Sequence, residues 1–221
     1  MKKFKVKAVL FDLWDTLAFT PAKNDIFNQL QERLGLNELT HWQFIDSCQK
    51  SMMLKPFLDE KQMLRSLCEY FSLEYGEIIL GDLTSIWIEG IKKNALYKDS
   101  KKALNHFKGK KPIALISNTE CFGWNSIKEK HKLHKEFNQI TLSFETSLLK
   151  PHPKIFHLTL KKLGVKPDET VMIGNSIKLD MEGAKRAGIK SILVDRENKH
   201  EKFNKADARI NSLEELTDLI E

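Results

Sequence analysis

Cysteine is scarce in this 221-residue chain, and long apolar runs are missing. Cys48, Cys68 and Cys121 are an odd number without close spacing, so the sequence indicates neither a disulfide framework nor a zinc knuckle. The longest apolar runs, such as AVLF and SILV, are far shorter than the ~20 residues of a membrane-spanning helix. The N-terminal stretch MKKFKVKAVLFDLWD has no signal-peptide cleavage pattern. We therefore expect a cytoplasmic protein without a membrane segment.

The basic charge of the chain lacks a nucleic-acid pattern. The formal net charge is +6, and lysines gather in MKKFKVK, KGKK, KEKHKLHK and ENKHEKFNK. These clusters are not interleaved with the stacking aromatic residues that single-strand binders use. We expect them to be solvated helix ends and loops rather than a nucleic-acid interface. A net positive charge also attracts small anionic molecules, which are the partners we expect.

Short β-branched runs alternate with helical patterns along the chain. KVKAVLFDL, KPIALISN, ETVMIGN and KSILVDR each end at a polar residue and are followed by a helix or turn pattern. Alternation of this kind is typical of a parallel sheet covered on both faces, in which ligands bind at the carboxyl ends of the strands. Asp12, Ser117 and Asn175 stand at such ends. The pattern therefore brings three polar residues to one edge of the sheet.

A long segment of different character separates the first two of these runs. From residue 22 to 94, apolar residues recur at helical spacing, as in IFNQLQERLGL and MLRSLCEYF. The spacing predicts a small helical bundle inserted after the first strand. Trp42, Phe71 and Trp87 fall in this segment, and we expect them in the bundle core rather than around a pocket.

Four motifs in order resemble those of the haloacid dehalogenase-like hydrolases. FDLWDTL is similar to the first motif, LISNT to the second, LLKPHPKIF to the third and VMIGNSIKLDMEGAKRAG to the fourth. The resemblance covers nearly the whole chain. It implies an α/β fold, in which a Rossmann-like parallel sheet core with helices on both faces carries an inserted α-helical cap. We assign residues 1–17 and 98–221 to the core and residues 18–97 to the cap, which would close over the nucleophile.

The resemblance also implies roles for the residues of these motifs. A carboxylate that is desolvated and aimed can attack an electrophile and form a covalent intermediate that water later hydrolyses, and Asp12 is placed for this. Lys150, in a loop stiffened by prolines, would offset the negative charge of the nucleophile and substrate. Ser117 and Asn118 resemble the second motif's donors to a phosphate or carboxylate. Asp180 is assigned to magnesium or to positioning water.

Magnesium is the cofactor that the resemblance implies. Mg²⁺ prefers oxygen ligands, and we expect Asp12, the Trp14 carbonyl, Asp180 and Asn175 to supply them. Family phosphatases usually have an acid where this chain has Asn175, so the site is expected to be weaker. The predicted substrate contacts are Trp14, Ser117, Asn118, Lys150 and Asn175.

Trp14 departs from the phosphatase pattern. Phosphatases of this family carry a second aspartate there, which protonates the leaving alcohol and then activates water, a contribution of roughly two to four powers of ten in rate. Indole cannot transfer that proton, although the main-chain carbonyl of residue 14 is retained. One interpretation is a magnesium-dependent phosphatase whose leaving group needs no proton, such as an acyl phosphate. Asp15 is a less favoured replacement for the acid, because adjacent side chains near a strand end point apart.

A 2-haloacid dehalogenase is the alternative, because halide departs without a proton and no metal is needed. Those enzymes have a large aromatic residue at this position, a substrate-binding arginine in the early cap and a tyrosine after the third motif. This chain reads ELTHWQFID in the early cap and has Phe156 in place of the tyrosine. Arg33 and Arg65 are expected on solvated faces.

The third alternative is a binding protein that retains the fold without catalysis. The presence of Asp12, Lys150 and Asp180 together argues against it. The prediction is thus a hydrolase with an aspartate nucleophile, most simply a Mg²⁺-dependent phosphatase acting on a small phosphorylated metabolite. We expect it to be a monomer or homodimer that binds neither nucleic acid nor membrane.

Overall fold

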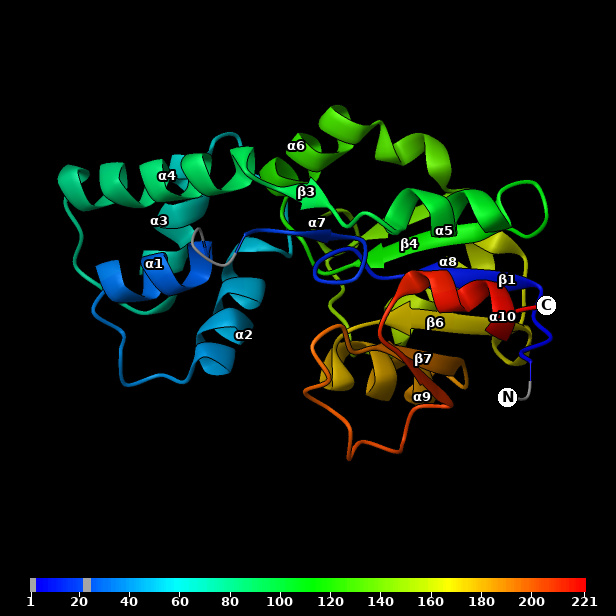
Figure 1. Cartoon of the computed structure of the whole chain (residues 1–221). Helices are drawn as coiled ribbons and strands as arrows, with labels where there is room; N and C mark the ends of the chain where they lie inside the picture. The colour runs from blue at the N-terminus through cyan, green and yellow to red at the C-terminus, as the bar shows by residue number, and fades with distance from the viewer. Residues whose placement is uncertain (1–2, 22–24) are drawn as a thin grey trace.

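A computed structural model describes residues 3–21 and 25–221 (Figure 1). Within these residues, six strands form one parallel sheet in the order β5-β4-β1-β6-β7-β8. The strands are β1 (Ala8–Phe11), β4 (Ile113–Ser117), β5 (Gln139–Leu142), β6 (Thr170–Gly174), β7 (Lys190–Val194) and β8 (Ala208–Ile210). The order places β1 in the interior, between β4 and β6. The predicted Rossmann-like α/β fold is confirmed.

Helices cover both faces of the sheet because successive strand residues point to opposite sides. Val9 and Phe11 of β1 belong to one apolar cluster, and Leu10 belongs to another. The first face is covered by α5 (Ser100–Phe107), α6 (Cys121–His131) and α10 (Leu216–Leu219). The second is covered by α8 (Pro153–Leu163) and α9 (Glu182–Arg186). Strands buried on both faces explain the continuous apolar runs of the sequence.

Shorter elements connect these layers. They are α7 (Ser143–Thr146), the 3₁₀ turns Leu133–Glu136, Pro167–Glu169 and Leu213–Glu215, and a π-helical turn at Ile177–Met181. None of the described helices is both long enough and apolar enough to cross a membrane.

The inserted segment folds as a helical unit with its own apolar core. Its helices are α1 (Ile26–Arg33), α2 (His41–Met52), α3 (Glu60–Tyr70) and α4 (Glu77–Lys92). Asp25 caps the first helix, Thr40 forms a capping box with Gln43 at the second, and Asp59 caps the third. Figure 1 shows the unit beside the end of the sheet to which the strand arrows point.

The aromatic residues of this unit divide between two environments. Trp87 is buried in the bundle core, and the half-buried Phe71 stacks on Phe44 with ring centroids 6.1 Å apart. Trp42 is half-buried outside that core, where the Lys178 Nζ lies 5.2 Å from its ring centroid. The expectation of a core position therefore holds for Trp87 but not for Trp42, because Phe44 and Cys48 occupy the bundle-facing side of α2.

A two-stranded ribbon joins the helical unit to the sheet. β2 (Ala18–Phe19) pairs antiparallel with β3 (Ala95–Leu96). Beside it, the Thr20 hydroxyl donates to Asn94 Oδ1 at 2.7 Å. The expected segment of residues 18–97 thus begins and ends in a short strand, and its helices lie between them. Its action as a closing cap stays a prediction.

Candidate active site

The carboxyl ends of three neighbouring strands meet at one edge of the sheet. Asp12 follows β1, Ser117 ends β4, and Asn175 follows β6. The Asp12 backbone N–H donates to Ile173 O at 2.9 Å, which continues the pairing of β1 with β6 and fixes where the Asp12 side chain begins. The predicted meeting of Asp12, Ser117 and Asn175 at this edge follows from the strand order.

Lys150 is buried between two carboxylates at this edge. Its Nζ lies 2.6 Å from Asp12 Oδ1 and 2.5 Å from Asp180 Oδ1. All three side chains are almost completely enclosed. Burial, with a further contribution from the Asp180 charge, raises the pKa of Asp12 to about 7 against the opposing effect of Lys150. Burial would lower the pKa of Lys150, but the two carboxylates outweigh it and hold that pKa above its usual value.

Asp180 is oriented by the turn that follows β6. Its Oδ2 accepts a hydrogen bond from the Ser176 backbone N–H at 3.0 Å, while its Oδ1 faces Lys150. A Cβ at Gly174 would lie 2.3 Å from that Oδ2, so only glycine allows Asp180 to approach the strand end. The glycine of the fourth motif therefore has a steric role in the site.

Thr16 links the nucleophile candidate to the fourth motif. Its hydroxyl lies 3.1 Å from Asp12 Oδ2 and 3.3 Å from Asn175 Oδ1, and Thr16 is fully buried. One hydroxyl carries one proton, so it cannot donate to both oxygens at once. Thr16 was not among the predicted site residues. Its place four residues after Asp12, in the same motif, was the available signal.

Asn118 is locked onto the main chain of Lys150. Its Oδ1 accepts from the Lys150 N–H at 2.8 Å, and its Nδ2 donates to the Lys150 carbonyl at 3.0 Å. The same Nδ2 also donates to Gln49 Oε1 on α2 at 2.8 Å. Ser117 is fully buried beside it, with its hydroxyl 3.4 Å from the Asn118 carbonyl. Gln49 was not among the predicted site residues, and nothing in its helical surroundings marks it.

The indole of Trp14 is anchored to the segment after β4. Its Nε1–H donates to Thr119 Oγ1 at 3.0 Å, and the ring packs against the main core cluster. The neighbouring Asp15 is exposed, with a φ of 59°, whereas Asp12 is buried. Among the described contacts, no hydrogen bond joins Asp15 to Asp12. The two acids thus occupy different surroundings, as expected for nearby side chains at a strand end.

The family described as haloacid dehalogenase-like hydrolase matches residues 6–188 of this chain. The chain belongs to that family. The resemblance carried by the four motifs is therefore confirmed, and the protein is a hydrolase of the haloacid dehalogenase-like type.

This hydrolase is similar in sequence to phosphatases, and its fold is similar to those of both phosphatases and dehalogenases. It is 39% identical over 64 residues to a glyceraldehyde 3-phosphate phosphatase from Methanopyrus kandleri, which is 29% of this chain and 28% of that protein. Its fold matches a phosphatase of the same family from Thermococcus onnurineus with a TM-score of 0.66, 22% identity and 96% of both chains covered. It matches the L-2-haloacid dehalogenase from Xanthobacter autotrophicus with a TM-score of 0.67, 19% identity and 97% and 98% coverage. The last two likenesses concern the fold alone.

The cap arginines and the residue after the third motif have other surroundings than a dehalogenase pattern requires. Arg33 Nη2 forms an ion pair with Asp82 Oδ2 at 2.6 Å on the surface between α1 and α4. Phe156 is fully buried under the second face of the sheet, where its ring lies close to Gly183. Arg65 is half-buried on α3 and contributes to the electrostatic surroundings of Glu77.

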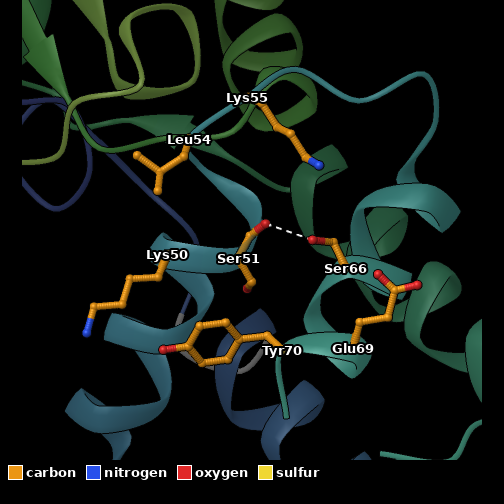
Figure 2. A pocket seen from close by; sticks show the side chains of 7 residues that line it. All are labelled: Lys50, Ser51, Leu54, Lys55, Ser66, Glu69 and Tyr70. Atoms are coloured by element: carbon orange, nitrogen blue, oxygen red, sulfur yellow. Dashed lines mark hydrogen bonds between the residues drawn. The ribbon is translucent and has the colours of Figure 1, made fainter. Parts of the chain in front are cut away.

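One surface pocket of the hydrolase lies away from the predicted catalytic residues. It has a volume of about 410 Å³ and lies between α2 and α3, as Figure 2 shows. Its walls are formed by Lys50, Ser51, Leu54, Lys55, Ser66, Glu69 and Tyr70. Ser66 already donates its hydroxyl proton to the Ser51 carbonyl at 3.0 Å. No predicted catalytic residue lines this pocket, so the chemistry is assigned to the edge.

Proposed function

We propose that this hydrolase is a phosphatase that uses Asp12 as its nucleophile. The observation that carries the proposal is the buried Lys150, which contacts Asp12 and Asp180 together at the strand ends. An ammonium held there offsets the charge of a carboxylate that attacks an anionic substrate. The shared stretch with a glyceraldehyde 3-phosphate phosphatase supports phosphate rather than halide as the product.

The residues act in two displacements. One oxygen of Asp12 attacks phosphorus, the bond from phosphorus to the leaving oxygen breaks, and the leaving group departs with the electron pair. Water then hydrolyses the aspartyl phosphate, which releases inorganic phosphate and restores Asp12. Lys150 balances charge in both steps, and the Ser117 hydroxyl and Asn118 main chain are the proposed donors to phosphate oxygens. Asp180 holds Lys150 in place.

The oxygens around Asp12 fit a single Mg²⁺. Asp12 Oδ2 and Asn175 Oδ1 share one Thr16 hydroxyl proton, so one of them always lacks that donor. The described residues include no cluster of three or more His, Cys, Asp or Glu side chains, so amide, carbonyl and water oxygens have to complete the ligands. We assign Asp12, Asn175, the Trp14 carbonyl and Asp180 to the ion. When bound, it supplies positive charge to the transferring phosphoryl group.

The residue at position 14 determines which phosphorylated substrates the proposed site can hydrolyse. No proton donor stands at that position, so the leaving group has to depart as a stable anion. Acyl phosphates meet this condition, because the departing carboxylate is a weak base. A small phosphorylated metabolite of this class is the substrate that we propose, and the helical unit is proposed to act as the cap that covers it.

A parallel assay of phosphate and halide release tests the proposal. Acetyl phosphate and 2-chloropropionate are each supplied with magnesium and with a chelator. We expect phosphate release that depends on magnesium and disappears in Asp12→Asn. Metal-independent halide release would establish the dehalogenase alternative instead. Binding without turnover of either compound, unchanged in Asp12→Asn, would indicate a non-catalytic protein.

A further inference from the structure

Helix α2 is the part of the helical unit that faces the sheet edge. Trp42 contacts Lys178 of the fourth motif, and Gln49 contacts Asn118 of the second. These two residues are seven positions apart and therefore share one face of the helix. Phe44 lies on the opposite face, in the bundle core. The chain after α2 continues along the same edge.

Two further contacts fix that continuation. The Ser147 hydroxyl donates to the Leu54 carbonyl at 2.9 Å, and Cys121 Sγ lies 3.9 Å from the Phe57 carbonyl. The contacts of α2 and its continuation thus reach the second and fourth motifs and the residue that precedes the third. This surface therefore covers part of the edge at which Asn118 follows β4.

The hydrogen bonds determine which way the Gln49 amide is turned. The Lys150 backbone N–H is a donor, so the Asn118 atom that it contacts must be the oxygen. The other Asn118 atom is then the NH₂ group, which donates to Gln49. The Gln49 atom that receives this bond must be its oxygen. The Gln49 NH₂ group therefore points away from Asn118.

This NH₂ group lacks a partner in the part of the chain that the structure describes. Gln49 is only 7% exposed, and its one described side-chain hydrogen bond is the one that its oxygen accepts. The nitrogen is not among the fully enclosed side-chain atoms that lack a partner, so it reaches the surface and can donate to water or to a ligand. A donor in this position is suited to a ligand oxygen.

In-line displacement decides where the leaving group lies. The attacking and leaving oxygens stand on opposite sides of phosphorus, so a phosphoryl group on Asp12 directs its leaving group away from the sheet. Because α2 contacts this edge through Gln49 and Trp42, we place the leaving group beside it. The acid on this stretch of the helix, Asp46, is held by Lys50 at 2.6 Å. The available group is the neutral amide of Gln49.

We propose that Gln49 binds the leaving group of an acyl phosphate through its carbonyl oxygen, an inference that rests on the proposed phosphatase function. As the bond from phosphorus to oxygen breaks, the electron pair moves onto the departing carboxylate and is shared with that carbonyl oxygen. The Gln49 N–H donates a hydrogen bond to the growing charge, and no proton is transferred. This interaction replaces the acid that Trp14 does not supply.

Two variants of Gln49 distinguish its proposed role as a donor to the substrate from its role as an acceptor for Asn118. Gln49→Met removes both functions at similar length, whereas Gln49→Glu keeps an acceptor for Asn118 but removes the donor. The measurement is kcat/KM for acetyl phosphate divided by kcat/KM for 4-nitrophenyl phosphate, which has no carbonyl next to its leaving oxygen. This ratio cancels the folded fraction of each variant and the charge effect of glutamate on two similar anions.

We expect the ratio to fall about tenfold in both variants, with the loss mainly in kcat for acetyl phosphate. Gln29→Met, on the exposed side of α1, is the matched control and should leave the ratio unchanged. An unchanged ratio in both variants, or a fall in Gln49→Met alone, would overturn the role as a donor. If the wild-type enzyme releases phosphate from neither compound, the proposed function itself fails, and the inference fails with it.

Discussion

At the sheet edge, Lys150 is buried between Asp12 and Asp180, whereas in the helical unit Lys92 pairs with Glu89 on the surface. The Lys150 side chain is 2% exposed and that of Lys92 is 63% exposed. A buried ion pair requires the removal of water from charges, and an exposed pair does not. The edge therefore keeps its charges buried despite the cost of desolvation, while the helical unit keeps this ion pair in solvent and contacts Asn118 through the neutral amide of Gln49.

The largest expected difference between the two regions is found when the buried and the exposed lysine are each replaced by methionine. Lys150→Met leaves two buried carboxylates without their cation, so we expect a loss of about 3 kcal/mol in the free energy of unfolding. We also expect hydrolysis to fall by at least about a hundredfold. Lys92→Met should change neither quantity measurably. Urea denaturation and phosphate release measure the two effects, and equal losses in the two variants would contradict the contrast.

Trp14→Asp tests whether the edge lacks only an acid. A carboxyl group at this position should raise hydrolysis of glycerol 3-phosphate by about tenfold, because an alcohol leaving group needs a proton. Acetyl phosphate should gain far less. Trp14→Leu, which also loses the bond to Thr119, is the control for lost packing.

The same Trp14→Asp variant distinguishes the two leaving groups. A carboxylate beside Asp12 would repel an anionic haloacid, so halide release should fall if the enzyme is a dehalogenase. If neither class of substrate responds, Trp14 has a packing role only.

Asn175→Asp tests the charge balance around the proposed magnesium site. A second carboxylate oxygen at the Thr16 hydroxyl should tighten Mg²⁺ binding by about tenfold, because the cation gains a charged ligand. Calorimetric titration with magnesium measures the affinity. Asn37→Asp adds the same charge on an exposed part of the helical unit and should have little effect. Unchanged affinity in Asn175→Asp would remove this residue from the site.

The last expected effect concerns the stability of the fold and the titration of Glu120, which caps α6. Burial raises the pKa of Glu120 to about 7, against the hydrogen bonds from Phe122 and Gly123. The folded protein thus holds this proton more strongly than the unfolded chain does. The resulting stability is present below the ordinary glutamate range and is lost as pH rises towards 7, by on the order of 3 kcal/mol.

Glu120→Gln should therefore lose less stability than the wild type does between pH 4.5 and 8. Melting temperatures at several pH values give the comparison. Parallel pH curves for the two proteins would show that Glu120 does not titrate in this range.

More of the sheet edge than of the helical unit could be predicted from the sequence. Asp12, Ser117 and Asn175 were expected together because the ends of parallel strands share an edge, and the family resemblance named Lys150. The contact of Gln49 with Asn118 joins residues 69 positions apart and depends on how a helix docks, which periodicity does not encode. Periodicity placed apolar residues inside the bundle, but it did not show that the other face of α2 is covered at Trp42.

The ribbon was also missed for a physical reason. β2 and β3 are two residues each, too short for an alternating pattern to be recognised. Their pairing becomes visible only when both ends of the insert are placed together.

Because β2 pairs with β3, the helical unit can be exchanged for another without altering the sheet domain. Ala18 lies opposite Leu96 and Phe19 opposite Ala95, so the segment leaves and re-enters the sheet domain at a single point. Closing a chain between adjacent ends places little demand on its length, since the entropy of loop closure grows slowly with the number of residues. A helical unit of another size, grafted between Phe19 and Ala95, would leave the strand register and the Asp12–Lys150 pair intact. If the proposed function holds, we expect the graft to change the choice of substrate and the sheet domain to keep the chemistry of Asp12.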